Sequence, residues 1–130
     1  MGKRYLTDTN IIIYYLGEIQ LSSKALDFID NVFSDEKNIS VITRMELLAF
    51  SFQNSADEKR VKEFVKSTTV FQLSSDVEKA VVKLRKNHKL KLPDAVIAAT
   101  ALTNGFTLLT RNTKDFKKIK GLKIINPFEL

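Results

Sequence analysis

The chain has 130 residues, of which 44% are hydrophobic, so residues 1–130 suit a single globular domain with one core. It has no cysteine and one histidine, which excludes disulfides, thiolate zinc sites and cysteine nucleophiles. No apolar run approaches the ~20 residues of a membrane-spanning helix, and the N-terminus lacks the apolar core of a signal peptide. We therefore expect a cytoplasmic protein that does not bind membranes.

In chain order, apolar periodicity and turn residues predict five strands separated by helices. The strands are expected at 3–7, 38–41, 69–73, 107–110 and 122–125, and the helices at 10–16, 22–33, 43–52, 55–66, 75–86 and 92–104, with a helical turn at 112–116. Strands that alternate with helices indicate parallel strands joined by right-handed crossovers. Because the strands are short and apolar, we expect helices to cover both faces of the sheet.

Charge is distributed unevenly along the chain. The net charge is +6, but the first 80 residues carry −2 and residues 81–130 carry +8. The basic segments are 83–91, which ends just before Asp94, and 111–123, which surrounds Asp115. A positive field around an acidic cleft suits a polyanion such as nucleic acid, and a solvated surface is the alternative explanation.

Each prominent acid also has a local structural explanation. Three segments match the S/T-x-x-E capping box, Thr43–Glu46, Ser55–Glu58 and Ser75–Glu78, so Glu46 can be a helix cap. Asp8 can cap the helix that starts near residue 10. Asp94 follows a proline in a first helical turn, where the helix dipole favours negative charge. No single acid therefore indicates a functional site.

Taken together, the four acids indicate a shared site at one edge of the sheet. Asp8 follows the first strand, Asp115 follows the fourth, and Glu46 comes a few residues after the second. Ligands of open α/β sheets bind beyond the carboxyl ends of the strands, and Asp94 joins that edge if its helix begins there. Neighbouring carboxylates cannot all ionise without a counter-charge, so we expect a divalent cation among them. Oxygen-only ligands favour Mg²⁺ or Mn²⁺.

Four segments carry a resemblance to a known family: TDTNI (7–11), TRMELL (43–48), KLPDAVIAATAL (91–102) and LLTRNTKDF (108–116). Taken together they resemble the PIN-domain ribonucleases, in particular the small VapC-like toxins of toxin–antitoxin pairs. The resemblance implies an α/β three-layer sandwich with a parallel five-stranded sheet of order 3-2-1-4-5. It also implies that the metal-binding and catalytic residues are Asp8, Glu46, Asp94 and Asp115.

The chain departs from the common family pattern at two positions. Phe50 stands where many relatives have glycine, which alters packing but removes no ligand. Asn112 stands where some relatives have a further acid. An amide oxygen adds no charge, so we expect one metal ion to bind firmly and a second only with substrate.

The resemblance implies a Mg²⁺- or Mn²⁺-dependent endoribonuclease that uses one or two ions and leaves 5′-phosphate and 3′-hydroxyl ends. It further implies a homodimer inhibited by a cognate antitoxin. The supporting residues, which would hold the acids or a phosphate oxygen, are Thr9, Asn10, Thr110 and Asn112; those expected to contact the RNA backbone are Lys89, Lys91, Arg111 and Lys114. The alternatives are a non-toxin PIN nuclease in RNA processing and a non-catalytic module that binds RNA or a partner.

Overall fold

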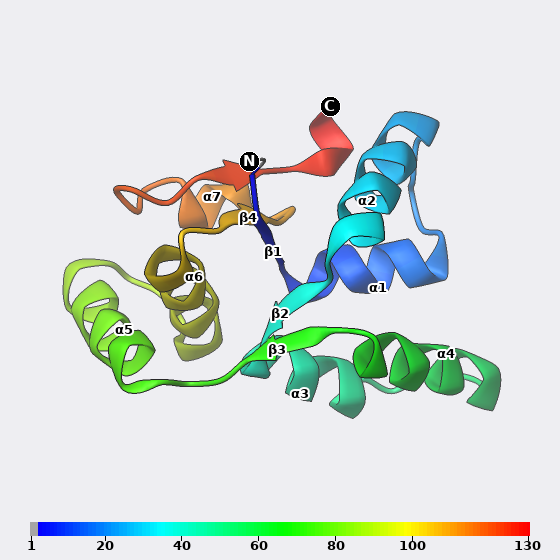
Figure 1. The fold of residues 1–130 in the computed structure, drawn as a ribbon, viewed down its shortest axis with the longest axis horizontal. Coiled ribbons are helices and arrows are strands. Elements are labelled where there is room, and N and C mark those ends of the chain that lie inside the picture. The colour runs from blue at the N-terminus through cyan, green and yellow to red at the C-terminus, as the bar shows by residue number, and fades with distance from the viewer. Residues whose placement is uncertain (1–2) are drawn as a thin grey trace.

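The computed structural model describes residues 3–130 and shows an α/β fold in three layers (Figure 1). Its elements are β1 (Tyr5–Thr7), α1 (Thr9–Gly17), α2 (Ser23–Asp35), β2 (Asn38–Ser40), α3 (Val41–Ala49), α4 (Ser55–Lys66), β3 (Thr69–Phe71), α5 (Ser75–Asn87), α6 (Leu92–Asn104), β4 (Thr107–Leu109), α7 (Thr113–Phe116), β5 (Ile124–Ile125) and the 3₁₀ turn η1 (Pro127–Glu129). Every predicted strand and helix is present, with ends shifted by up to a few residues.

The five strands are parallel, but backbone ladders join them as two groups, β1–β4–β5 and β2–β3. β2 lies beside β1, and the Asn38 side chain donates from Nδ2 to the Tyr5 carbonyl oxygen at 3.1 Å across this junction. The order 3-2-1-4-5 therefore agrees with the prediction. The prediction of one continuous sheet does not agree with the structure, because a side-chain hydrogen bond takes the place of the expected backbone ladder between β2 and β1.

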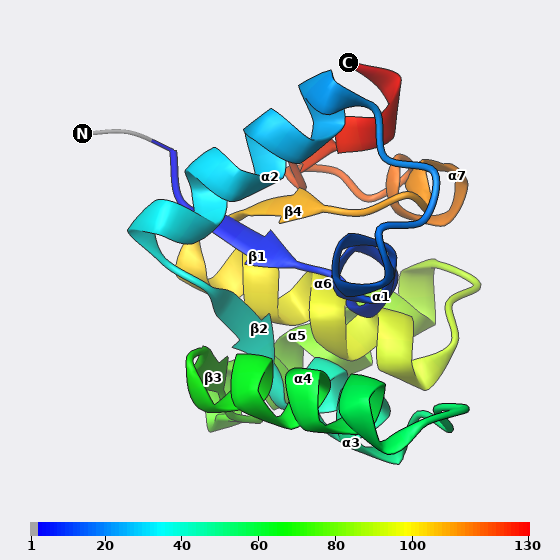
Figure 2. The ribbon, with the colours of Figure 1, turned by 90° about the vertical axis from the view of Figure 1, so that its right-hand side faces the viewer.

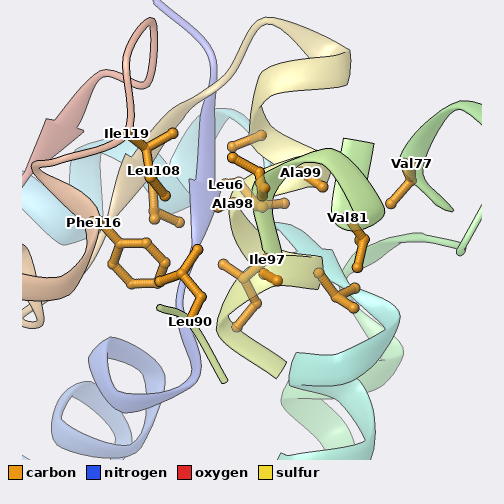
Figure 3. Packing of buried hydrophobic residues seen from close by; sticks show 14 of the residues in the cluster. Leu6, Val77, Val81, Leu90, Ile97, Ala98, Ala99, Leu108, Phe116 and Ile119 are labelled. Atoms are coloured by element: carbon orange, nitrogen blue, oxygen red, sulfur yellow. The ribbon is translucent and has the colours of Figure 1, made fainter. Parts of the chain in front are cut away.

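Helices cover the sheet on both faces, with α1 and α2 on one side and α5 and α6 on the other (Figure 2). The cluster in Figure 3 packs Leu6 and Leu108 of the strands against Ile97 and Phe116. The next residue, Leu109, belongs to the opposite cluster, as the alternation of side chains along a strand requires. The three layers expected from sequence are therefore present.

The direction of α6 is what brings Asp94 to the ligand-binding edge. α6 ends at Gly105, whose left-handed backbone (φ 69°) closes the helix, and β4 begins two residues later at Thr107. This short connection turns the chain back, so α6 runs opposite to β4. The N-terminus of α6, with Asp94 in its first turn, consequently lies at the carboxyl ends of the strands.

Within residues 3–130, none of the helices is both long and apolar enough to cross a bilayer.

Candidate functional site

Asp8 is held rigidly where β1 passes into α1. Its backbone N–H extends the strand ladder to the Leu109 carbonyl oxygen at 2.9 Å. Its side chain caps α1, with Oδ1 accepting from the Thr9 N–H at 2.8 Å and Oδ2 accepting from the Thr110 hydroxyl at 2.8 Å. The expected helix cap is therefore confirmed, and the same carboxylate faces the strand edge.

The ionised form of the Asp8 carboxyl is also destabilised by its surroundings. The residue is only 6% exposed, and burial raises the pKa of its carboxyl from 3.8 to about 6. The two hydrogen bonds lower the pKa in part, whereas the nearby negative charges of Asp94 and Glu46 raise it further. The carboxylate at this position therefore lacks a full counter-charge.

Glu46 is not the capping residue that its local sequence suggested. α3 begins two residues before Thr43, with Ser40 as its N-cap, and the Ser40 hydroxyl accepts from the Thr43 N–H at 3.1 Å. Instead, Glu46 Oε1 accepts from the Thr9 hydroxyl at 2.5 Å, and this hydroxyl lies 3.0 Å from Thr43 Oγ1. The capping-box interpretation is wrong, since an earlier serine satisfies that N–H, and Glu46 is tied to the residue beside Asp8.

Asp94 comes from the opposite side of the edge, in the first turn of α6. It is half-buried, and its pKa is raised first by burial and then by the charges of Asp115 and Glu46, while Lys91 lowers it. The negative charge of Asp94 in turn raises the pKa of Asp8. Four residues from separate parts of the chain thus lie within electrostatic reach of one another.

A chain of hydrogen bonds links Asp115 to Asp8. Thr110 is fully buried, and its hydroxyl donates to Asp8 and accepts from the Asn112 N–H at 2.9 Å. The Asn112 side chain then donates to Asp115 Oδ2 at 2.9 Å. Of the predicted supporting residues, Thr9, Thr110 and Asn112 therefore hold acids. Asn10 does not, and its buried Oδ1 has no hydrogen-bond partner.

The four carboxylates share an edge without forming a complete ligand shell. Among residues 3–130, no three acidic or histidine side chains are grouped closely enough to hold a metal ion by themselves. Magnesium commonly keeps several waters and takes only one or two carboxylates, so the donors fit such an ion. His88 lines a different hollow with Lys83 and Lys120, which leaves only oxygen donors at the edge.

Basic side chains border the acids on one side. A hollow at the end of α5 is lined by Arg85, Lys89 and Lys91 together with Asp94 and Asp115. The predicted contacts Lys89 and Lys91 are therefore beside the site, and Lys114 is exposed on the same short helix as Asp115. Arg85 belongs to the basic segment noted in the sequence but was not singled out.

Arg111 follows Thr110, whose hydroxyl bonds Asp8, and lies in a setting that the sequence did not reveal. Its guanidinium packs against Tyr14 of α1 and Phe128 near the C-terminus. These residues are far apart in the chain, so no local pattern connects them. Only the motif around Arg111 itself marked it as a candidate.

The fold and this edge define an α/β protein with a parallel sheet and an acidic, oxygen-only site rimmed by cations. The family model of the PIN domain matches residues 5–122, and the chain belongs to the PIN-domain family. It is 31% identical to Ribonuclease VapC1 of Rickettsia felis, over 92% of this chain and 93% of that protein. It is 34% identical to the plasmid stability protein StbB of Pseudomonas syringae pv. tomato, over 95% and 98% of the two chains.

Solved structures agree on the fold. A chain of a toxin–antitoxin complex from Klebsiella pneumoniae superposes with a TM-score of 0.77 at 33% sequence identity, covering 97% of this chain and 99% of that one. A chain of DNA-bound VapBC from Salmonella typhimurium gives a TM-score of 0.81 at 21% identity, with coverage of 97% and 99%. The second likeness, at its lower identity, concerns the fold alone.

Proposed function

We propose that this protein is a divalent-metal-dependent endoribonuclease and the toxin of a toxin–antitoxin pair. The observation that carries the proposal is the gathering of Asp8, Glu46, Asp94 and Asp115 at one sheet edge, where burial and mutual repulsion raise the pKa values of Asp8 and Asp94. The similarity to a protein named as a ribonuclease, and to a chain of a toxin–antitoxin complex, supports this activity and this role.

The residues divide into metal-holding and orienting groups. Asp8 and Asp94 would hold a Mg²⁺ or Mn²⁺ ion, and Glu46 and Asp115 would complete the site directly or through water. When bound, such an ion supplies positive charge that activates water and stabilises the charge of the transition state. Thr9 and Thr110 fix the carboxylates by donating hydrogen bonds to them. With an amide at position 112, we expect one firmly held ion.

The basic hollow at the end of α5 would attract the phosphates of RNA, which the acids themselves repel. Lys89, Lys91 and Lys114 would contact the RNA backbone and give affinity that falls with salt, without selecting a sequence. Attack by water in line with the leaving oxygen, rather than by the ribose 2′-hydroxyl, would leave 5′-phosphate and 3′-hydroxyl ends.

A cognate antitoxin and a homodimer are also part of the proposal. Support for a protein partner comes from an apolar hollow lined by Ile13, Leu16, Ile19, Phe50 and Phe52. Within it Ile19 is 43% exposed and Phe50 is 46% exposed. Exposed apolar surface of this kind commonly marks protein contacts.

The test is incubation of RNA with purified protein, with and without Mn²⁺, followed by mapping of the cut ends. Asp94→Asn should abolish cleavage and keep the fold, because the amide preserves shape but not charge. Asp76→Asn is a matched control, since Asp76 also stands in a first helical turn but is exposed on α5. Cleavage that needs the metal yet survives Asp94→Asn would refute the proposal, as would 2′,3′-cyclic phosphate ends.

A further inference from the structure

The Arg111 guanidinium occupies a corner formed by two aromatic rings. Its central carbon is 4.5 Å from the ring centroid of Tyr14 and 4.5 Å from that of Phe128. The rings pack edge to face, with centroids 5.6 Å apart and planes at 70°. The three centres form a triangle and not a line, so the rings do not enclose the guanidinium from opposite sides. Arg111 is half-buried and lines a shallow hollow.

Three separate segments build this corner. Tyr14 comes from α1, Arg111 from the loop after β4, and Phe128 from η1, which packs against α2 (Figure 2). Asn126 fixes η1 by accepting from the Phe128 N–H at 2.9 Å. Gln20, in the α1–α2 loop, accepts from Arg111 Nη1 at 3.3 Å. The guanidinium is thus oriented before any ligand binds.

The charge of Arg111 is not neutralised within the protein. Among residues 3–130 the ion pairs engage Arg4, Arg60 and Lys62, and none engages Arg111. Aromatic rings attract a cation without cancelling its charge. A guanidinium has five N–H donors, of which one serves Gln20, so donors remain for an anion.

The position of Arg111 is next to the acidic edge. Its sequence neighbours are Thr110 and Asn112, whose side chains hold Asp8 and Asp115. Arg111 also lines a shallow hollow with Asn10 and Asn112, which is separate from the basic hollow at the end of α5 that Asp94 and Asp115 line. A strand of RNA bound at the acids would therefore find cations in two separate hollows beside them.

We propose that Arg111 binds the backbone phosphate adjacent to the scissile one, and that Tyr14 and Phe128 are positioning residues that hold its guanidinium for this contact. This inference rests on the proposed function, which makes the substrate RNA. A planar guanidinium fork matches two phosphate oxygens, and holding it in advance reduces the entropy lost on binding. Lysine cannot replace it, because an ammonium lacks the planar fork.

The experiment measures the binding of a short fluorescent single-stranded RNA by anisotropy, in EDTA, so that cleavage is not needed. Arg111→Gln and Arg111→Lys should each weaken binding about tenfold, as expected for lost charge-assisted hydrogen bonds. Arg111→Gln should also reduce the slope of log K against log salt by about 0.7, the value for one phosphate of a single strand. Lys79→Gln, an exposed charge on α5, is the control for net charge.

Phe128 provides the readout that separates positioning from charge. Phe128→Leu keeps apolar bulk but removes the ring, so it should weaken binding several-fold while leaving the salt slope unchanged, and Phe128→Tyr should restore affinity. Thermal unfolding of each variant separates these effects from a loss of η1. For the full reaction we expect a raised KM with kcat nearly unchanged, since the contact is made in substrate and transition state alike.

Several outcomes would overturn the inference. They are an Arg111→Gln protein that binds RNA within about twofold of wild type, and a Phe128→Leu protein with unchanged affinity for RNA. If the variants show these binding effects but wild type cuts no RNA in Mn²⁺, the nuclease proposal fails, and Arg111 stands as an RNA-phosphate site without a scissile neighbour. A wild-type protein that binds no RNA would refute both.

Discussion

Asp8→Asn should stabilise the metal-free protein at neutral pH, although it removes a proposed metal ligand. The carboxyl has a pKa of about 6 in the folded protein and 3.8 as its ordinary value. An acid whose pKa is raised by folding binds its proton more tightly in the folded state. Folding is therefore opposed once pH exceeds 3.8, and the full cost is reached above about pH 6.

The magnitude follows from the shift of about two units, which corresponds to about 3 kcal/mol at 1.36 kcal/mol per unit. Asparagine avoids this cost and can still cap α1, because its amide oxygen can accept from the Thr9 N–H. It cannot accept from Thr110 at the other position, where an NH₂ now faces the hydroxyl. The lost hydrogen bond costs about 1 kcal/mol, so we expect Asp8→Asn to raise the free energy of unfolding by about 2 kcal/mol.

Urea unfolding in EDTA would measure the difference between wild type and Asp8→Asn from about pH 4 to about pH 8. The variant should be equal or slightly less stable at the acid end and gain its advantage as pH rises through about 6. Asp76→Asn, at an exposed position of α5, is the control for the loss of one carboxylate. An Asp8→Asn protein that is less stable at pH 7.5, or a difference that does not vary with pH, would refute the reasoning.

Two further predictions follow from the same edge. Mn²⁺ at about 100 times its Kd should stabilise wild type by about 2.7 kcal/mol in urea unfolding, and Asp94→Asn should lose most of this gain; equal gains in both proteins would argue against the site. Ser40→Ala should cost about 1 kcal/mol because Ser40 caps α3, whereas Glu46→Gln should leave stability nearly unchanged and abolish cleavage. Activity that survives Glu46→Gln would make Glu46 structural.

The sequence predicted which segments form strands and helices better than where the helices begin. Each predicted capping box is out of place, because an earlier side chain caps the helix. Ser40, Asn54 and Ser74 accept from the N–H three residues on and begin α3, α4 and α5. A segment with several hydroxyl or amide side chains offers several possible starts. The end of the preceding strand or loop selects one of them, and that is tertiary information.

The topology predicted the acidic edge, because carboxyl ends of parallel strands necessarily face one way. It could not predict the partners of the acids. The bonds from Thr9 to Glu46 and from Thr110 to Asp8 join residues far apart in the chain, as does the corner of Tyr14, Arg111 and Phe128. These contacts depend on how the elements pack, for which local sequence gives no signal.

Capping and metal binding are not competing explanations of these acids. α1 and α7 follow strands and α6 runs opposite to β4, so the N-termini of these three helices and their acids gather at the carboxyl edge of the sheet. Asp8 caps α1, Asp94 lies in the first turn of α6, and Asp115 lies in that of α7. The helix ends offset part of the negative charge. Burial and the neighbouring acids nevertheless raise the pKa values of Asp8 and Asp94, and the proposed cation would offset the charge of the ionised carboxylates.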